Sequence, residues 1–126
     1  MRLSEAIRLG AMLSPQTRGA FFSRRGDAVA TCALGAASVA TGIGELAGMH
    51  LSEQWPILDM IVPRDKLPQE LRFRHTALSI ANAVMALNDS AGWSRNRIAD
   101  WVEKFEEPKI QADDEDDAAA ILVCQV

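Results

Sequence analysis

Leu87–Phe105, which reads LNDSAGWSRNRIADWVEKF, decides the fold of this chain. Its first part, Asn88–Gly92, is rich in the residue types that form turns. Ser94 is the expected N-cap of a helix, because a serine hydroxyl can accept a hydrogen bond from a first-turn amide. We therefore predict a turn followed by a capped helix, and we interpret Asn88 and Asp89, like Ser94, as structural caps.

The helix after Ser94 has one apolar face. Trp93 lies just before the cap and is spaced to pack on Ile98, which is the arrangement of a hydrophobic staple. Pro108 then ends the helix. The pattern predicts an amphipathic helix that buries four positions spaced i, i+3, i+4 and i+7, namely Ile98, Trp101, Val102 and Phe105.

The segment before the turn predicts a long helix over about residues 68–87. Pro68 suits a first-turn position, and apolar residues recur downstream of it with helical spacing. Arg72 and Arg74 are expected on the solvent side of this helix. A shorter helix is expected over 56–62, also entered by a proline. The two helices that flank the turn should pack antiparallel.

The first helix is expected to begin at Ser4 as its N-cap and to end near Leu13. Ser14 precedes Pro15, and a residue before proline avoids the α region. The next segment, about residues 20–31, predicts a short β-hairpin, because apolar and β-branched residues flank a glycine-containing turn.

A helix of small residues is expected over 32–41, capped by Thr31. Cys32 at its start is interpreted as a buried small hydrophobe, and a glycine at position 35 costs about 1 kcal/mol relative to alanine. Close packing of another element is the physical reason for such a glycine.

The fold prediction is therefore a mostly α, compact bundle of about five helices with one short hairpin. Residues 1–109 form a single helical domain, and residues 110–126 form an acidic, apolar-ended tail. The expected core residues are Ile7, Phe22, Cys32, Ala36, Val39, Trp55, Ile57, Ile80, Val84, Leu87, Ile98, Trp101, Val102 and Phe105.

Composition narrows the protein class. Of the 126 residues, 48% are hydrophobic and 24% are charged, which is typical of a globular domain. No apolar run reaches the roughly 20 residues that span a bilayer. The first residues lack the apolar run of a signal peptide, so we expect a cytoplasmic protein without membrane association.

Charge is unevenly distributed along the chain. The net charge is −4, and the acidic block Asp113, Asp114, Glu115, Asp116 and Asp117 lies close to the C-terminus. Arginines dominate the first 25 residues, among them Arg18, Arg24 and Arg25. Such asymmetry is typical of a binding surface or an acidic tail. These arginines and the acidic block are our candidate partner-binding residues.

Two chemical alternatives draw on weaker patterns. Cys32 at a helix start, followed by His75 and then Asn88 or Asp89, has the order of a cysteine hydrolase. The N-terminal arginines could instead contact nucleic acid. No metal-ligand spacing and no cofactor motif is present, so no catalytic, metal or cofactor site is predicted.

Two stretches resemble a broad group of short, uncharacterised bacterial and phage proteins. The first is Cys32-Ala33-Leu34-Gly35-Ala36-Ala37, a Cys-x-Leu-Gly helix start. The second is Leu87-Asn88-Asp89 followed by Ser94 and Ile98-Ala99-Asp100-Trp101-Val102-Glu103. Thr31-Cys32 stands where many members have adjacent cysteines. The resemblance implies a phage, prophage or mobile-element setting and no particular activity.

Taken together, these features predict a small non-enzymatic protein-interaction module, an accessory or inhibitor protein that binds another macromolecule. Its expected partner is another protein, and self-association stays open. The alternatives are a nucleic-acid-associated protein and a cysteine hydrolase.

Overall fold

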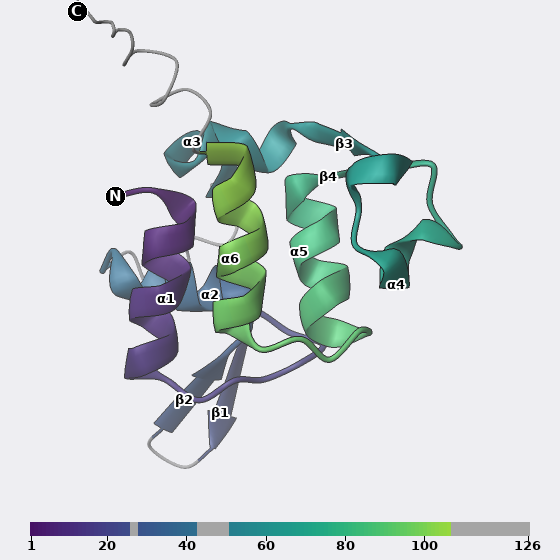
Figure 1. Ribbon diagram of the computed structural model, residues 1–126. Coiled ribbons are helices and arrows are strands. Elements are labelled where there is room, and N and C mark those ends of the chain that lie inside the picture. The colour runs from purple at the N-terminus through teal and green to yellow at the C-terminus, as the bar shows by residue number, and fades with distance from the viewer. Residues whose placement is uncertain (26–27, 43–50, 107–126) are drawn as a thin grey trace, which may run out of the picture.

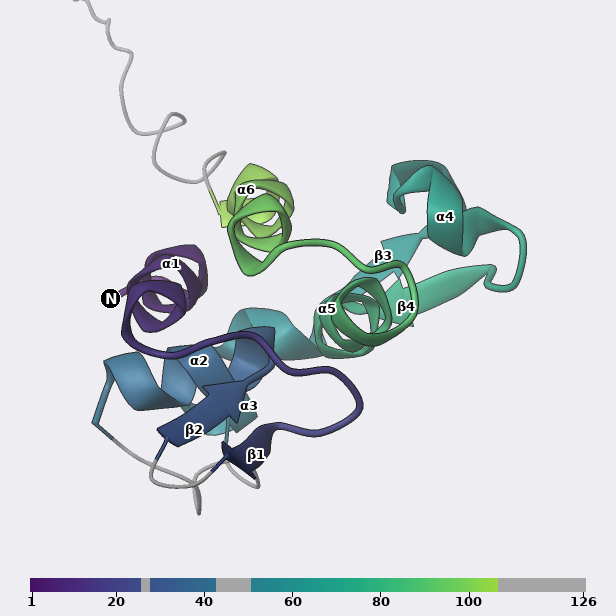
Figure 2. The same ribbon diagram turned by 90° about the horizontal axis from the view of Figure 1, so that it is seen from below.

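Three helices run side by side in the computed structural model, which describes residues 1–25, 28–42 and 51–106 (Figure 1). They are α1 (Leu3–Leu13), α5 (Ile80–Asp89) and α6 (Arg95–Glu106). A fourth, α2 (Ala33–Ala40), packs against one face of α1 and α5 (Figure 2). The described part of the chain is mostly helical, as the sequence predicted.

The predicted hairpin is present. Strand β1 (Phe22–Arg25) pairs antiparallel with β2 (Ala28–Thr31), and Phe22 lies opposite Thr31. Gln16 adds a single parallel bridge to Thr31, so the segment after α1 runs along the outer side of β2. The hairpin therefore rests on the loop that follows α1 rather than standing alone.

The middle of the chain differs from the prediction. The long helix expected over 68–87 is wrong, because Ser79 begins a new helix there: its hydroxyl accepts a hydrogen bond from Asn82 N at 3.1 Å. The helix expected over 56–62 is shorter and is followed by a strand. The segment consists of α3 (Leu51–Gln54), η2 (Pro56–Asp59), β3 (Ile61–Pro63), η3 (Arg64–Lys66), α4 (Gln69–Arg72) and β4 (Ala77–Ser79), with β3 and β4 paired antiparallel.

Two expected N-caps are also wrong by a residue or two. The N-cap of α1 is Arg2, whose backbone N donates to Glu5 Oε1 at 2.9 Å. Ser4 is fully buried inside the first turn, and its hydroxyl donates to Glu106 of α6 at 2.5 Å. The N-cap of α2 is Cys32 rather than Thr31, because Thr31 is held in β2.

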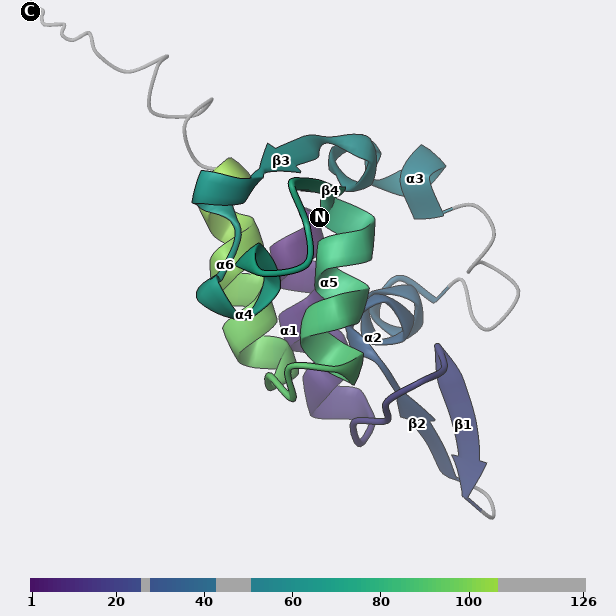
Figure 3. The same cartoon turned by 90° about the vertical axis from the view of Figure 1, so that its right-hand side faces the viewer.

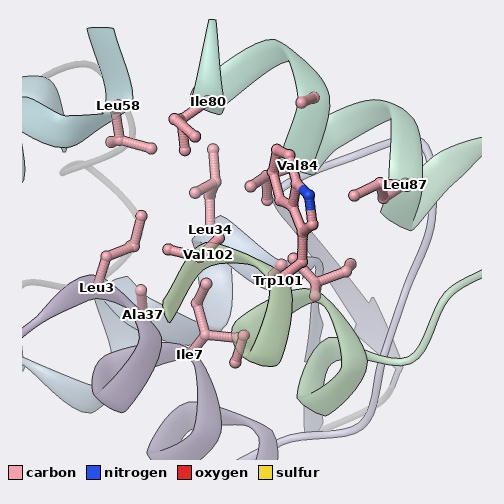
Figure 4. Packing of buried hydrophobic residues seen from close by; sticks show 14 of the residues in the cluster. Leu3, Ile7, Leu34, Ala37, Leu58, Ile80, Val84, Leu87, Trp101 and Val102 are labelled. Carbon is pink, nitrogen blue, oxygen red and sulfur yellow. The ribbon is translucent and has the colours of Figure 1, made fainter. Parts of the chain in front are cut away.

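Buried side chains of the four main helices and of the segment from α3 to α4 form one hydrophobic cluster (Figure 4). Most of the predicted core residues belong to it, and Ile57 and Phe105 pack against it while partly buried. Phe22 and Val39 are only half-buried and lie outside the cluster, so their prediction as core residues is wrong. The neighbouring Phe21 packs on the cluster in place of Phe22.

Two glycines permit close approach of the backbone. A Cβ added at Gly10 of α1 would lie 1.8 Å from the carbonyl oxygen of Ala36, so α1 and α2 cross backbone to backbone at this point. A Cβ at Gly35 would lie 2.2 Å from the carbonyl oxygen of Phe21. Close packing at Gly35 was predicted, and its neighbour is a loop carbonyl.

Arg95 joins three parts of the fold. Arg95 lies outside the apolar spacing of α6, yet only 7% of it is exposed. Its guanidinium donates to Ser14 O at 2.6 Å and to Thr31 Oγ1 at 2.9 Å, with a longer bond to Ala11 O at 3.4 Å. A cation is favoured there, because the last carbonyls of a helix carry partial negative charge. Arg95 thus ties the end of α1 and the end of β2 to the start of α6.

We expect Arg95→Lys to lower the free energy of unfolding by about 2–3 kcal/mol. A lysine keeps the charge, but its single ammonium cannot reach acceptors that a planar guanidinium contacts on two sides. Urea unfolding followed by circular dichroism measures the change. Arg18→Lys is the matched control, since Arg18 is exposed and donates to Gly92 O at 3.3 Å, and it should change stability by less than about 0.5 kcal/mol. Equal stability of the two variants contradicts this role for Arg95.

Candidate functional site

A cleft of about 640 Å³ opens between α6 and the segment that runs from η3 to α4. We call it the basic cleft, because among the residues that the structure describes four cationic side chains line it and Glu70 is the one acidic side chain. α4 and α6 lie on the same side of the molecule, away from the hairpin (Figures 2 and 3). The four cations are Lys66, Arg72, Arg97 and Lys104.

Helix α6 forms one wall of the basic cleft. Arg97, Trp101 and Lys104 follow one another at i, i+4 and i+7, which places them on one face of a helix. Trp101 is only 6% exposed and its ring packs edge-on against Phe105 at 5.0 Å between centroids. The buried indole anchors this wall, and the two cations flank it.

The floor of the cleft is a three-residue contact between α4 and the start of α6. The Trp93 indole donates to Glu70 Oε2 at 3.0 Å, and the Arg97 guanidinium lies 3.7 Å from the centroid of the same indole. Arg97 also approaches Glu70 Oε2 at 3.9 Å. The hydrogen bond from Trp93 is the main cause that lowers the pKa of Glu70, with a smaller contribution from Arg97. Glu70 therefore keeps its negative charge to a lower pH than a free glutamate does, and this charge lies beside that of Arg97.

Apolar side chains border the cleft. Phe73, at its rim, is 87% exposed. An adjoining hollow of about 440 Å³ shares Lys66, Trp101 and Lys104 with the cleft and adds Met60 and Phe105. The surface therefore offers exposed carbon next to positive charge, which suits a ligand with both anionic and apolar groups.

Asn88 and Asp89 do not form the predicted turn. Both belong to the last turn of α5, and Asn88 is fully buried. Asn88 Nδ2 donates to Thr17 O, and Asp89 Oδ1 accepts from Gly19 N, each at 2.9 Å. They hold the loop after α1 rather than capping a helix. Ser94 Oγ does accept from Arg97 N at 3.1 Å, as an N-cap does.

The predicted partner-binding arginines lie outside the basic cleft. Arg18 is exposed on the loop after α1, and Arg24 is exposed on β1. Arg25 also belongs to β1. The views agree that α5 separates the hairpin from α4 (Figures 2 and 3). Asp113, Asp114, Glu115, Asp116 and Asp117 lie outside the described residues.

Cys32 occupies a setting unlike that of a nucleophile. It is 3% exposed, and its sulfur accepts from Gly35 N at 3.4 Å. Burial raises the pKa of the thiol, so it is protonated near neutral pH. His75 lies beside a separate hollow that Cys32 does not line. Within the described ranges, no three histidine, cysteine, aspartate or glutamate side chains gather as metal ligands.

Sequence reasoning missed the basic cleft because its walls are far apart in the chain. Arg97 and Lys104 lie outside the apolar spacing of their helix, and the bond between Trp93 and Glu70 spans 23 residues. The i, i+4, i+7 spacing of Arg97, Trp101 and Lys104 was the one local signal. None of the described helices is long and apolar enough to cross a membrane. Comparison with protein-family models, with curated proteins and with solved structures finds no match for the chain.

The contact between Trp93 and Glu70 predicts a pH dependence. Because folding lowers the pKa of Glu70, its stabilisation is present above the unfolded-state pKa and is lost as pH falls through the lower folded-state pKa. The indole N–H resonance of Trp93 should therefore shift at a pH below the ordinary glutamate pKa of about 4.3. Two-dimensional ¹H–¹⁵N NMR across an acid titration measures this, and Glu70→Gln should abolish the shift. A Trp93 resonance that titrates identically in both proteins rules the contact out.

Proposed function

We propose that this protein is a small non-enzymatic protein-interaction module, an accessory or inhibitor protein, whose basic cleft binds an acidic segment of a partner protein. The observation that carries the proposal is the gathering of four cationic side chains around one open cleft, to which the described part of the chain contributes a single carboxylate. That carboxylate, Glu70, is already engaged by Trp93 and Arg97. Positive charge therefore remains for an incoming anion.

The charge balance of the described residues supports an acidic partner. Eight of the chain's 17 acidic residues lie outside the described ranges, whereas only one of its 13 lysines and arginines does. The described part of the protein is consequently net positive although the whole chain is net negative. Complementary charge of this kind steers association and selects partners.

The dimensions of the basic cleft favour an extended peptide over a compact anion. Arg97 and Lys104 are seven residues apart on α6, which is about 10 Å along a helix axis. About three residues of extended chain span that distance. A run of several aspartates or glutamates can therefore meet both cations, and a planar arginine fork can hold a carboxylate in two hydrogen bonds.

The apolar side chains beside the cleft indicate which residues accompany the acidic run of the partner segment. Phe73, which lines the cleft, is almost fully exposed, and Met60, which lines the adjoining hollow, is 41% exposed. Large apolar side chains grouped beside charge are typical of binding sites. We infer that the partner segment carries apolar residues next to its acidic run.

Single-stranded nucleic acid is the competing ligand, because basic grooves with aromatic platforms bind it. The cleft fits it less well. The Trp93 ring is covered by Arg97, and Trp101 is buried, so among the three aromatic side chains of the cleft only Phe73 is exposed. Base stacking along a strand needs several exposed rings.

We extend the proposal to the setting of the protein, which we place in the cytoplasm and in a phage or mobile-element context. The support is the resemblance carried by Cys32–Ala37 and Leu87–Glu103, together with the buried free thiol of Cys32. Self-association is compatible with the same surface. The environment of Cys32 does not favour the cysteine-hydrolase alternative.

Fluorescence anisotropy with a labelled eight-residue oligo-aspartate peptide tests the proposal on the full chain. We expect saturable binding that weakens as salt is added. Lys104→Glu should weaken it by about tenfold or more, since it places a repelling charge in the cleft. Arg74→Glu is the control with the same change of charge, because Arg74 is exposed and does not line the cleft, and its effect should stay within about twofold.

Three outcomes contradict the proposal. The peptide binds neither the wild-type chain nor a chain whose acidic run Asp113–Asp117 is neutralised, or Lys104→Glu and Arg74→Glu weaken its binding equally. In the third, an eight-nucleotide oligothymidylate binds more tightly than the peptide and is the more sensitive of the two to Lys104→Glu. That result would replace the acidic peptide with single-stranded nucleic acid as the ligand of the cleft.

A further inference from the structure

The chain carries, close to its own C-terminus, a segment of the composition that the basic cleft fits. Asp113–Asp117 are five consecutive acidic residues, and Ala118–Val123 after them are all apolar. We propose that Asp113–Asp117 of the same molecule occupy the basic cleft in the free protein and must be displaced by a partner's acidic segment. This inference rests on the function proposed above.

The length of chain after α6 permits this placement. Helix α6 ends at Glu106, and Asp113 follows seven residues later. Seven residues of extended chain reach about 23 Å. The far end of the cleft wall, Arg97, lies nine residues back along α6, which is about 14 Å. The chain after α6 is therefore long enough for the acidic run to reach any part of this wall.

Three hollows that share lining residues lie between the end of α6 and the cleft. A hollow of about 300 Å³ adjoins Phe105 and Glu106 at the helix end. Phe105 also lines the next hollow, with Trp101 and Lys104. Trp101 and Lys104 in turn line the basic cleft. The hollow at the end of α6 is therefore linked through shared lining residues to the basic cleft.

Because the acidic run belongs to the same chain as the cleft, even weak contacts are sufficient to keep it bound there. Exposed ion pairs contribute about 0.2–1 kcal/mol each, so a free peptide of five acids would bind loosely. A short tether raises the effective concentration to the millimolar range, which favours occupancy without any added contact. A partner must then compete with that concentration, so its apparent affinity is lowered until it engages further surface. The acidic run would act as an internal competitor that rejects weak acidic ligands.

Zero-length carbodiimide coupling of the full chain tests the proposal. The reagent joins a carboxylate to a lysine ammonium as an amide with loss of water, so only groups already in contact are linked. The chain has three lysines, Lys66, Lys104 and Lys109. Trypsin cleaves after Lys109 and leaves residues 110–126 as one peptide without lysine or arginine. Mass spectrometry can then report a link from this peptide to Lys66 on the opposite wall of the cleft.

We expect the link to Lys66 in monomeric protein, with a yield that falls as salt is raised. Lys104→Glu should lower the yield severalfold, and Arg74→Glu should leave it unchanged. Absence of the Lys66 link while Lys109 reacts overturns the inference. A link found only in cross-linked dimers also overturns it, because the occupant would then be a second copy of the chain.

A second measurement separates this inference from the proposed function. Neutralising the run by Asp113→Asn, Asp114→Asn, Glu115→Gln, Asp116→Asn and Asp117→Asn should tighten oligo-aspartate binding at least threefold, because the competitor is gone. If the peptide binds wild type and this variant equally and the Lys66 link is absent, the inference fails and the proposed function stands. If neither protein binds the peptide, the proposed function fails.

Discussion

The buried guanidinium of Arg95 is the contact on which the arrangement of this protein depends. It satisfies carbonyls at the end of α1 and the hydroxyl of Thr31 at the end of β2 from the first residue of α6. Burial lowers the pKa of Arg95, yet an arginine stays protonated in proteins, so the charge must be met by these acceptors. A buried guanidinium without hydrogen-bond acceptors would lower the stability of the fold. The contacts of Arg95 with α1 and β2 therefore fix where α6 starts.

The position of that junction sets the geometry of the basic cleft. Trp93 and Ser94 immediately precede Arg95, and Gln16 Nε2 donates to Trp93 O at 2.9 Å from the same loop after α1. Because Gln16 and Arg95 fix the backbone at Trp93, its indole donates to Glu70, and the Arg97 guanidinium lies over the ring. The floor of the cleft is thus built by the contacts that hold the helices together, and the cations of α6 follow from the register of that helix.

Local signals in the sequence were enough for some elements and not for others. The cap at Ser94 and the apolar spacing of α6 are properties of neighbouring residues, so that helix was predicted accurately. The burial of Arg95 depends on hydrogen-bond acceptors 64 to 84 residues away. The residues next to Arg95 in the sequence therefore do not indicate that its side chain is buried. The prediction of one long helix over 68–87 is wrong because the pairing of β4 with β3 outweighs helical periodicity there. Ser79, which caps α5, is the local signal that separates the two parts. The cleft joins distant segments, so its residues were not recognised as a site.

The most direct test of the central claim, that the basic cleft is the binding site, observes the Trp93 indole while the oligo-aspartate peptide is added. Two-dimensional ¹H–¹⁵N NMR of the full chain resolves this N–H, whose acceptor is Glu70. The backbone amide of Gly35, which donates to the Cys32 sulfur in the first turn of α2, provides the comparison within the same spectra. We predict a saturable shift of the Trp93 indole with Gly35 unmoved. A Trp93 indole that stays fixed at saturating peptide, or that moves no more than Gly35, would contradict the account.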